Sequence, residues 1–231
     1  MNSLDIFNNS ISLFILATCM TIDIIRAVKF RTREWMLLFL YHTLIFLSAL
    51  YYELYALLLG DEAHSGHIYE LGCYVSYLFL IILLQYIRDK EMDSKRYRSL
   101  ILIPVFTFAM AVGFIMYSEG DVLSNVICAL LMWMLLRETV KGGLYNKEKY
   151  GKTYTSKWLY RASFIFCYLE YQTWVLSCFF FDDSWTNPFY WSDIMLSISY
   201  ILFIPAVDRI VKDRVAKADG SSMIQSLKSG G

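Results

Sequence analysis

Charged residues and helix-breaking residues are scarce in this 231-residue chain. Asp, Glu, Lys and Arg make up 18% of it, against about a quarter in a typical soluble domain. With only 3 prolines and 11 glycines, collagen-like and low-complexity classes are excluded. The 21 basic residues balance the 21 acidic residues, so nothing in the composition indicates a nucleic-acid partner.

Motifs for catalysis and for metal binding are also missing from the sequence. There is no P-loop, nucleophile elbow, HExxH or dinucleotide-binding glycine pattern. The 5 cysteines form no CxxC and no Cys/His spacing suited to a metal, and a plain polar loop is the simpler interpretation of His64 and His67. An enzyme is therefore the least supported class, and we expect no metal and no cofactor.

Hydrophobic residues, in contrast, make up 57% of the chain and aromatic residues 17%, with a mean hydropathy of +0.43. A bilayer core of about 30 Å needs roughly 20 apolar residues in a helix. The sequence predicts an all-α, polytopic membrane protein: a seven-transmembrane-helix bundle over residues 1–207 and a short cytoplasmic helical tail over 208–231. The seven predicted spans are 5–25, 36–59, 68–87, 100–117, 122–136, 158–181 and 191–207.

The basic residues predict the topology. All 21 of them fall in four segments, 26–33, 88–98, 137–161 and 209–228, which follow alternate spans and so lie on one side. By the positive-inside rule this side is cytoplasmic, with the N-terminus outside a plasma membrane and the C-terminus inside. In the links on the other side, all the charged residues are acidic: Asp61, Glu62, Glu119, Asp121, Asp182 and Asp183.

A parallel repeat is also indicated. Residues 75–81 can be laid over 198–204 at a shift of 123, and the same shift places Trp35 on Trp158. This pattern suggests a 3+1+3 arrangement, two triple-helix units joined by the fourth span. That arrangement resembles small carriers such as the SWEET group. Aromatic and aliphatic helices share composition, so chance similarity is the competing explanation.

Ionisable residues inside the spans are costly and need a partner or a function. The functional interpretation is an outward-facing pocket for a small cationic or amine-bearing ligand, recognised by ion pairing and cation–π contact. Glu170 and His42 are also candidates for proton coupling, whereas a structural interpretation has each acid only fixing helix packing. The predicted ligand-binding residues are Glu53, Glu70, Glu170, Tyr171, Trp174 and Asp193.

Three features carry a resemblance to a known class: an opening span with Asn8 and Asn9, the run 51–60 with its following polar loop, and the length of the seven-span block. Together they resemble the seven-helix sensory domains that precede output modules in many Firmicute signalling proteins, such as diguanylate cyclases and histidine kinases. The resemblance implies a sensor. We expect no kinase, cyclase or DNA-binding domain after Arg214, so a cytoplasmic signalling partner or a homodimer would receive the signal. A small transporter and a structural scaffold are the alternatives.

Overall fold

The computed structural model describes residues 3–59, 67–117, 122–151, 154–180, 182 and 184–229, and all regular structure among them is helical. Two short 3-10 helices, Lys90–Ser94 and Arg98–Ile101, lie between α3 and α4. The α-helices are α1 (Ser3–Phe30), α2 (Arg33–Leu59), α3 (His67–Ile87), α4 (Leu102–Tyr117), α5 (Val122–Tyr150), α6 (Lys157–Phe179), α7 (Pro188–Ile201) and α8 (Phe203–Ser229).

Within the described residues, six stretches are long and apolar enough to cross a membrane, and α7 with the first part of α8 forms one of them. The protein is thus an all-α bundle whose apolar helices fit a multi-pass membrane protein. The predicted sixth span forms α6 but falls outside this set. Glu170 and Gln172 lower its hydropathy, and α6 packs against α5, α7 and α8, where a helix can carry polar groups facing other helices.

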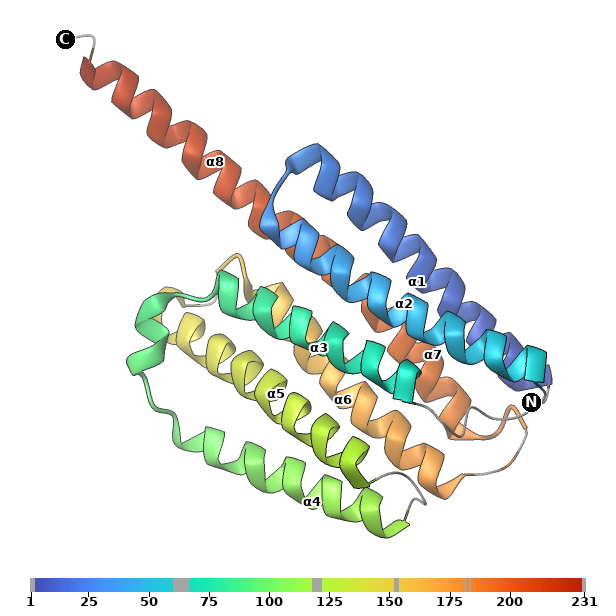
Figure 1. The fold of residues 1–231 in the computed structure, drawn as a ribbon. Helices are drawn as coiled ribbons and strands as arrows, with labels where there is room; N and C mark the ends of the chain where they lie inside the picture. The colour runs from blue at the N-terminus through green and yellow to red at the C-terminus, as the bar shows by residue number, and fades with distance from the viewer. Residues whose placement is uncertain are drawn as a thin grey trace.

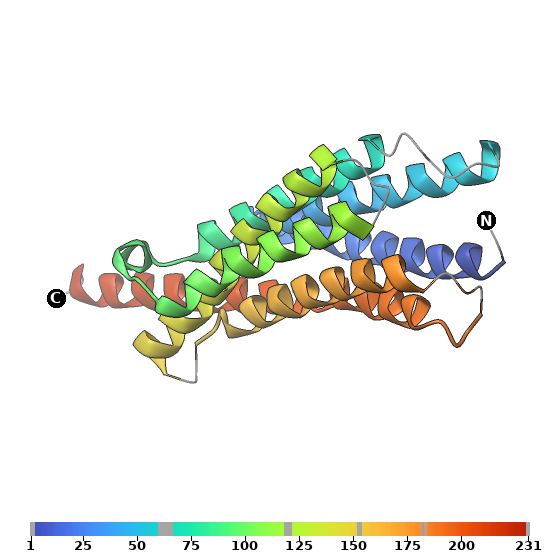
Figure 2. The same cartoon turned by 90° about the horizontal axis from the view of Figure 1, so that it is seen from below.

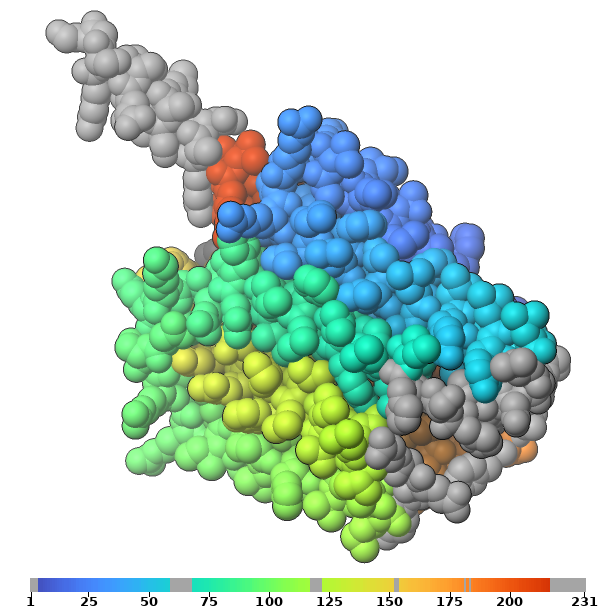
Figure 3. Space-filling view, in the orientation of Figure 1, coloured from blue at the N-terminus to red at the C-terminus, as the bar shows by residue number. Residues whose placement is uncertain are grey.

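The helices form a ring in the order α1, α2, α3, α5, α6, α7, with α4 on the outside against α5 (Figure 1). Figure 2 shows the same elongated bundle from below, with the N-terminus and the end of α8 at opposite ends. In the space-filling view α1, α2, α3, α5 and α4 follow one another across one face (Figure 3).

Two glycines permit close approach of neighbouring helices. A Cβ atom at Gly72 of α3 would lie 1.9 Å from the Ser48 hydroxyl of α2, and one at Gly142 of α5 would lie 2.1 Å from the Tyr160 ring of α6. Small residues at helix contacts are how membrane helices approach each other closely. These positions therefore fix the α2–α3 and α5–α6 distances.

Pro205 accounts for the break between α7 and α8. A proline has no amide hydrogen, and its ring collides with the carbonyl group four residues earlier, here that of Ile201. α7 ends at Ile201, and the amide of Leu202 instead bonds the carbonyl of Ser199 at 3.1 Å. α8 then continues without interruption through residue 208, where the sequence placed the start of the tail.

The burial pattern suits an apolar solvent. Many large apolar side chains point outward and are exposed, including Phe14 at 74%, Phe108 at 71% and Met116 at 74%. Polar groups such as Asp23 and His42 are fully buried. An apolar outer surface, with polar groups buried against other helices in a mostly apolar core, is the arrangement expected in lipid.

Ion pairs gather at the end of the bundle from which α8 projects (Figure 1). Asp208 and Lys212, four residues apart on α8, form an ion pair at 2.6 Å. Asp23 and Arg26 are three residues apart on α1, a spacing that suits an ion pair, but Arg26 contacts Asp208 at 3.2 Å instead, because Asp23 is buried against α2. Of the acidic residues predicted to be outside, Asp182 accepts a hydrogen bond from Ser184 at 2.9 Å. The other five, with His64, lie outside the described residues.

The two segments aligned as a repeat differ in structure. Residues 75–81 lie within the unbroken α3, whereas 198–204 contain the α7–α8 break. Trp35 is fully buried, whereas Trp158 is 47% exposed. The repeat stays a prediction from the sequence.

Candidate functional site

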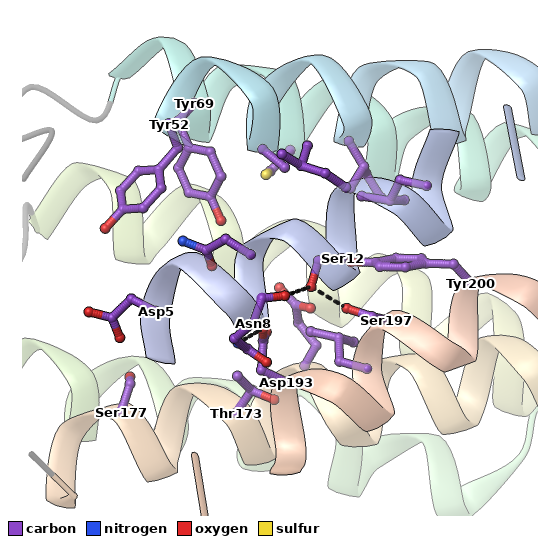
Figure 4. A pocket seen from close by; sticks show the side chains of 18 of the residues that line it. Asp5, Asn8, Ser12, Tyr52, Tyr69, Thr173, Ser177, Asp193, Ser197 and Tyr200 are labelled. Carbon is purple, nitrogen blue, oxygen red and sulfur yellow. Dashed lines mark hydrogen bonds between the residues drawn. The ribbon is translucent and has the colours of Figure 1, made fainter. Parts of the chain in front are cut away.

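A cavity of about 500 Å³ lies inside the ring, at the end of the bundle where the chain begins (Figure 4). Its walls come from α1, α2, α3, α6 and α7, and its size falls within the usual range of small-molecule sites, roughly 300–1,000 Å³. Three carboxylic acids line it, Asp5, Glu170 and Asp193. Among the described residues that line it there is no lysine, arginine or histidine.

Each carboxylate is oriented by a neighbouring helix. Asp193 of α7 accepts a hydrogen bond from the Asn8 amide of α1 at 2.6 Å, and Asp5 accepts one from the Tyr190 hydroxyl at 2.7 Å. Glu170 of α6, deeper along the bundle, accepts a hydrogen bond from the Tyr77 hydroxyl of α3. Hydrogen bonds that satisfy buried carboxylates also hold them in place.

The α1–α7 wall follows from helical spacing. Asn8 and Ser12 are four residues apart on α1, and Asp193 and Ser197 are four apart on α7, so each pair lies on one face. The Ser12 and Ser197 hydroxyls are 2.7 Å apart, one turn further into the bundle than the Asn8–Asp193 bond (Figure 4). Two hydrogen-bonded pairs of side chains, one helical turn apart, thus join α1 to α7.

Four aromatic side chains, which we call the aromatic plug, pack at the inner end of the cavity: Tyr41, Phe166, Tyr200 and Phe203. Their ring centroids lie between 5.4 Å and 6.3 Å apart in edge-on or tilted pairs. Tyr200 belongs to both the cavity wall and the plug. Since Tyr41, Phe166 and Phe203 are essentially inaccessible, the plug separates the cavity from the basic end of the bundle.

Three of the predicted ligand-binding residues line the cavity: Glu170, Trp174 and Asp193. Glu53 is 5% exposed and lies just behind the wall, where it accepts a hydrogen bond at 2.8 Å from Asn9, a lining residue. The structure therefore brings four of the six predicted residues together: three line the cavity, and Glu53 is joined to it through Asn9.

Glu70 and Tyr171 lie elsewhere. Glu70 is on the side of α3 that faces α5, where it accepts a hydrogen bond from Ser124 at 2.5 Å. Tyr171 packs edge-on against Phe106 of α4, with ring centroids 5.3 Å apart. Successive helical residues are about 100° apart, so Tyr171 cannot share the face of Glu170 as Trp174 does.

His42 is fully buried and lies beyond the plug from the cavity. Its Nδ1 is 2.5 Å from the carboxylate of Asp23, and its ring lies 6.3 Å from Tyr200 and 6.4 Å from Phe203. It does not line the cavity. Its contact with Tyr200, which lines the cavity, connects it to the cavity through the aromatic plug.

Several lining residues were missed by the sequence reasoning: Asp5, Tyr52, Tyr69, Thr173, Ser177 and Tyr190. Tyr52 and Tyr69 lie near span ends, where aromatic residues commonly sit at the headgroup level, so their positions in the sequence do not indicate a cavity. Asp5 shares the face of Asn8, Asn9 and Ser12, and this spacing was the available signal. No cluster of three or more His, Cys, Asp or Glu suited to a metal occurs in the described part of the chain.

The fold and the site together define a class: a helical bundle with the apolar helices of a multi-pass membrane protein and an acidic, aromatic-walled cavity at one end. Comparison with known protein families, with curated proteins and with solved structures finds no match.

Proposed function

We propose that the protein is an integral membrane sensor that detects a small cationic ligand in this cavity and relays its binding through α8 to a cytoplasmic partner. The observation that carries the proposal is the set of three carboxylates with no basic side chain among the described lining residues. Enclosed charge of one sign favours a ligand of the opposite sign. The role is one of binding, with no catalysed reaction.

The remaining lining groups suit an ammonium or amidinium ligand. Asn8 Oδ1 is buried and accepts no hydrogen bond from any described residue, so it is available to an N–H donor. Tyr52, Tyr69 and Trp174 supply π faces for cation–π contact (Tyr52 and Tyr69 in Figure 4).

The orientation supports an outward-facing site. In the proposed topology α6 is the sixth span, α7 with the start of α8 is the seventh, the basic end is cytoplasmic and the N-terminal end with the cavity faces outside. A ligand reaching the cavity would then come from the exterior. The resemblance to bacterial sensory domains agrees with this arrangement.

A route for the signal runs through α7. Asp193, Ser197 and Tyr200 lie on the cavity side of α7, and Tyr200 packs against Phe166 of the plug. Phe203, the first residue of α8, belongs to the same plug. If the ligand binds more tightly when α7 is in one placement than in another, its binding favours that placement. The shift of α7 would then move α8 through the shared plug.

A small transporter of the 3+1+3 kind is the second candidate. The buried Glu170 and His42 favour it, because ionisable groups at membrane depth are often proton carriers. The aromatic plug favours the sensor, since it closes the cavity at its inner end. A scaffold with purely structural acids is the third candidate.

Thermal unfolding of the purified protein tests the proposal, with choline and putrescine as cationic probes and glycerol as the neutral one. A ligand that binds the folded state raises the melting temperature with its concentration. We expect choline or putrescine to do so in the wild type and not in Glu170→Gln or Asp193→Asn. Glu70→Gln is the matched control, because Glu70 lies outside the cavity.

The outcomes separate the three candidates. A shift lost in E170Q and D193N and kept in E70Q supports a cation site. Uptake of the same probe into proteoliposomes would identify a transporter instead of a sensor. No shift with either cation, together with lower stability of both cavity variants, would support the scaffold.

A further inference from the structure

A basic and aromatic cluster lies on the outer surface at the junction of α6 and α8. The guanidinium carbon of Arg209 lies 5.0 Å from the ring centroid of Trp158, and that of Arg161 lies 5.3 Å from it. Lys157 Nζ is 5.9 Å from the same ring. Cations from two helices thus converge on one indole, which is 47% exposed.

The two guanidinium groups are not neutralised by a neighbouring carboxylate in the part of the chain that the structure describes. Within the described side chains neither Arg161 nor Arg209 is ion-paired, whereas Arg26, Arg88, Lys149 and Arg214 each contact a carboxylate. Both arginines are exposed. Their charge is therefore directed outward, into the region next to the bundle.

Apolar surface continues from the cluster along both helices. On the α7–α8 side, steps of three and four residues from Arg209 lead to exposed positions at Pro205, Leu202, Ile198 and Met195. On α6, exposed Ile165 and Tyr168 follow Arg161 on its face. A pair of cations therefore lies at the end of an apolar strip at membrane depth.

We propose that Trp158, Arg161 and Arg209 form a binding site for the phosphate of an anionic phospholipid, with phosphatidylglycerol as the simplest ligand of this kind. Arginine pairs with phosphate oxygens through a planar fork of N–H donors, and tryptophan favours the headgroup level. The acyl chains lie along the apolar strip. Basic sites between membrane helices at the cytoplasmic surface bind anionic headgroups in this manner.

The charge explains the choice of lipid. A zwitterionic headgroup carries its own cation, which would be repelled by two guanidinium groups, whereas phosphatidylglycerol is a net anion. A soluble phosphate ester has the same anionic group but cannot cover the strip. The site would hold an annular lipid against α8, independently of any ligand in the cavity.

Native mass spectrometry of the protein in detergent, titrated with phosphatidylglycerol or phosphatidylcholine, tests the site. Each basic residue near a membrane surface contributes about 1 kcal/mol, roughly a fivefold change in affinity. We expect Arg161→Gln/Arg209→Gln to weaken phosphatidylglycerol binding about thirtyfold and to leave phosphatidylcholine binding unchanged. Thermal unfolding in lipid-free detergent checks that the variant remains folded.

Arg96→Gln/Arg137→Gln is the matched control. Both residues are exposed and without an ion pair in the described structure, but only Arg137 lies over an indole, that of Trp133, at 6.0 Å. Wild-type affinity in this control supports the site. Equal losses in the two double variants would overturn it in favour of diffuse charge, as would displacement of the lipid by soluble glycerol phosphate. Unchanged binding in R161Q/R209Q would also overturn it.

Discussion

Asp23 and His42 form a 2.5 Å hydrogen bond between α1 and α2, and neither side chain is accessible. The second oxygen of Asp23 and Nε2 of His42 have no other partner among the described residues. Each side chain thus has one polar atom in the shared hydrogen bond and one buried polar atom outside it, within an aromatic environment. Polar pairs of this kind are costly to separate, because the remaining group is then buried alone.

We predict strong energetic coupling between these two residues. Asp23→Ala and His42→Ala should each lower the free energy of unfolding by about 3 kcal/mol, since each leaves a buried polar group unpaired. The double variant should lose less than the sum, by about 1–3 kcal/mol. Unfolding in mixed micelles measures this cycle. Thr21→Ala is the control, because its exposed hydroxyl bonds only the carbonyl of Ala17, and it should change little. Strict additivity would contradict the pairing.

The contact between α2 and α3 predicts a position-specific effect of alanine. Gly72→Ala should cost about 1–3 kcal/mol, because its Cβ would meet the Ser48 hydroxyl at 1.9 Å and the Ser48 Cβ at 3.2 Å. Gly113→Ala in α4 has nothing within 4 Å of the new Cβ and should be neutral or slightly stabilising. Adding Ser48→Gly to G72A should recover part of the loss. Thermal unfolding compares the variants, and equal effects of G72A and G113A would refute the close approach.

The stability that Lys149 adds by contacting the segment after α3 should depend on pH. Lys149 bonds Asp89 at 2.7 Å and Glu91 at 2.8 Å, and these bonds lower the pKa values of both carboxyl groups below their ordinary 3.8 and 4.5. A lowered pKa stabilises the folded state above the ordinary pKa, and this stabilisation is lost as the pH falls through the lowered value.

Lys149→Met should therefore reduce the melting temperature by a constant amount above about pH 5, and the difference from the wild type should shrink below pH 4.5. Thermal unfolding between pH 7 and about pH 3 measures this difference. Lys147→Met is the control, because Lys147 is exposed and forms no ion pair among the described residues. A difference between K149M and the wild type that does not change with pH would contradict the linkage.

Patterns within one helix were largely readable from the sequence. Hydropathy located the helices, and the spacing of Asp193, Ser197 and Tyr200 in the sequence places them on one face of α7. That face lines the cavity. Such patterns depend only on the helical repeat, which the sequence contains.

Pairings between helices were not readable in the same way. Asp23 pairs with His42 rather than Arg26, and Glu70 faces Ser124 rather than the cavity, because each depends on the rotation of one helix against another. Tyr171 was assigned to the cavity through its neighbour Glu170, although adjacent residues point to different sides. Rotation is set by contacts such as that of Gly72 with Ser48, which no single helix specifies.

Arg214 anchors α8 to the neighbouring helices α2 and α3. Arg214 contacts Glu34 of α2, whose side chain is 3% exposed, and its guanidinium carbon lies 5.1 Å from the Tyr86 ring centroid of α3. Arg214→Gln would leave Glu34 buried without its cation, which costs more than losing an exposed pair. We expect faster amide hydrogen exchange in residues 208–229 of this variant and unchanged exchange around the cavity.

The same measurement tests the relay between the cavity and α8. If α8 is the output of a sensor, choline or putrescine should alter exchange in 208–229 of the wild type, and R214Q should reduce this response without abolishing the thermal shift. Arg96→Gln serves as the control, since Arg96 lies in the link between α3 and α4, away from α8. A cation that stabilises the protein but leaves exchange in α8 unchanged in every variant would separate binding from relay. The cavity would then serve a function that does not pass through the tail.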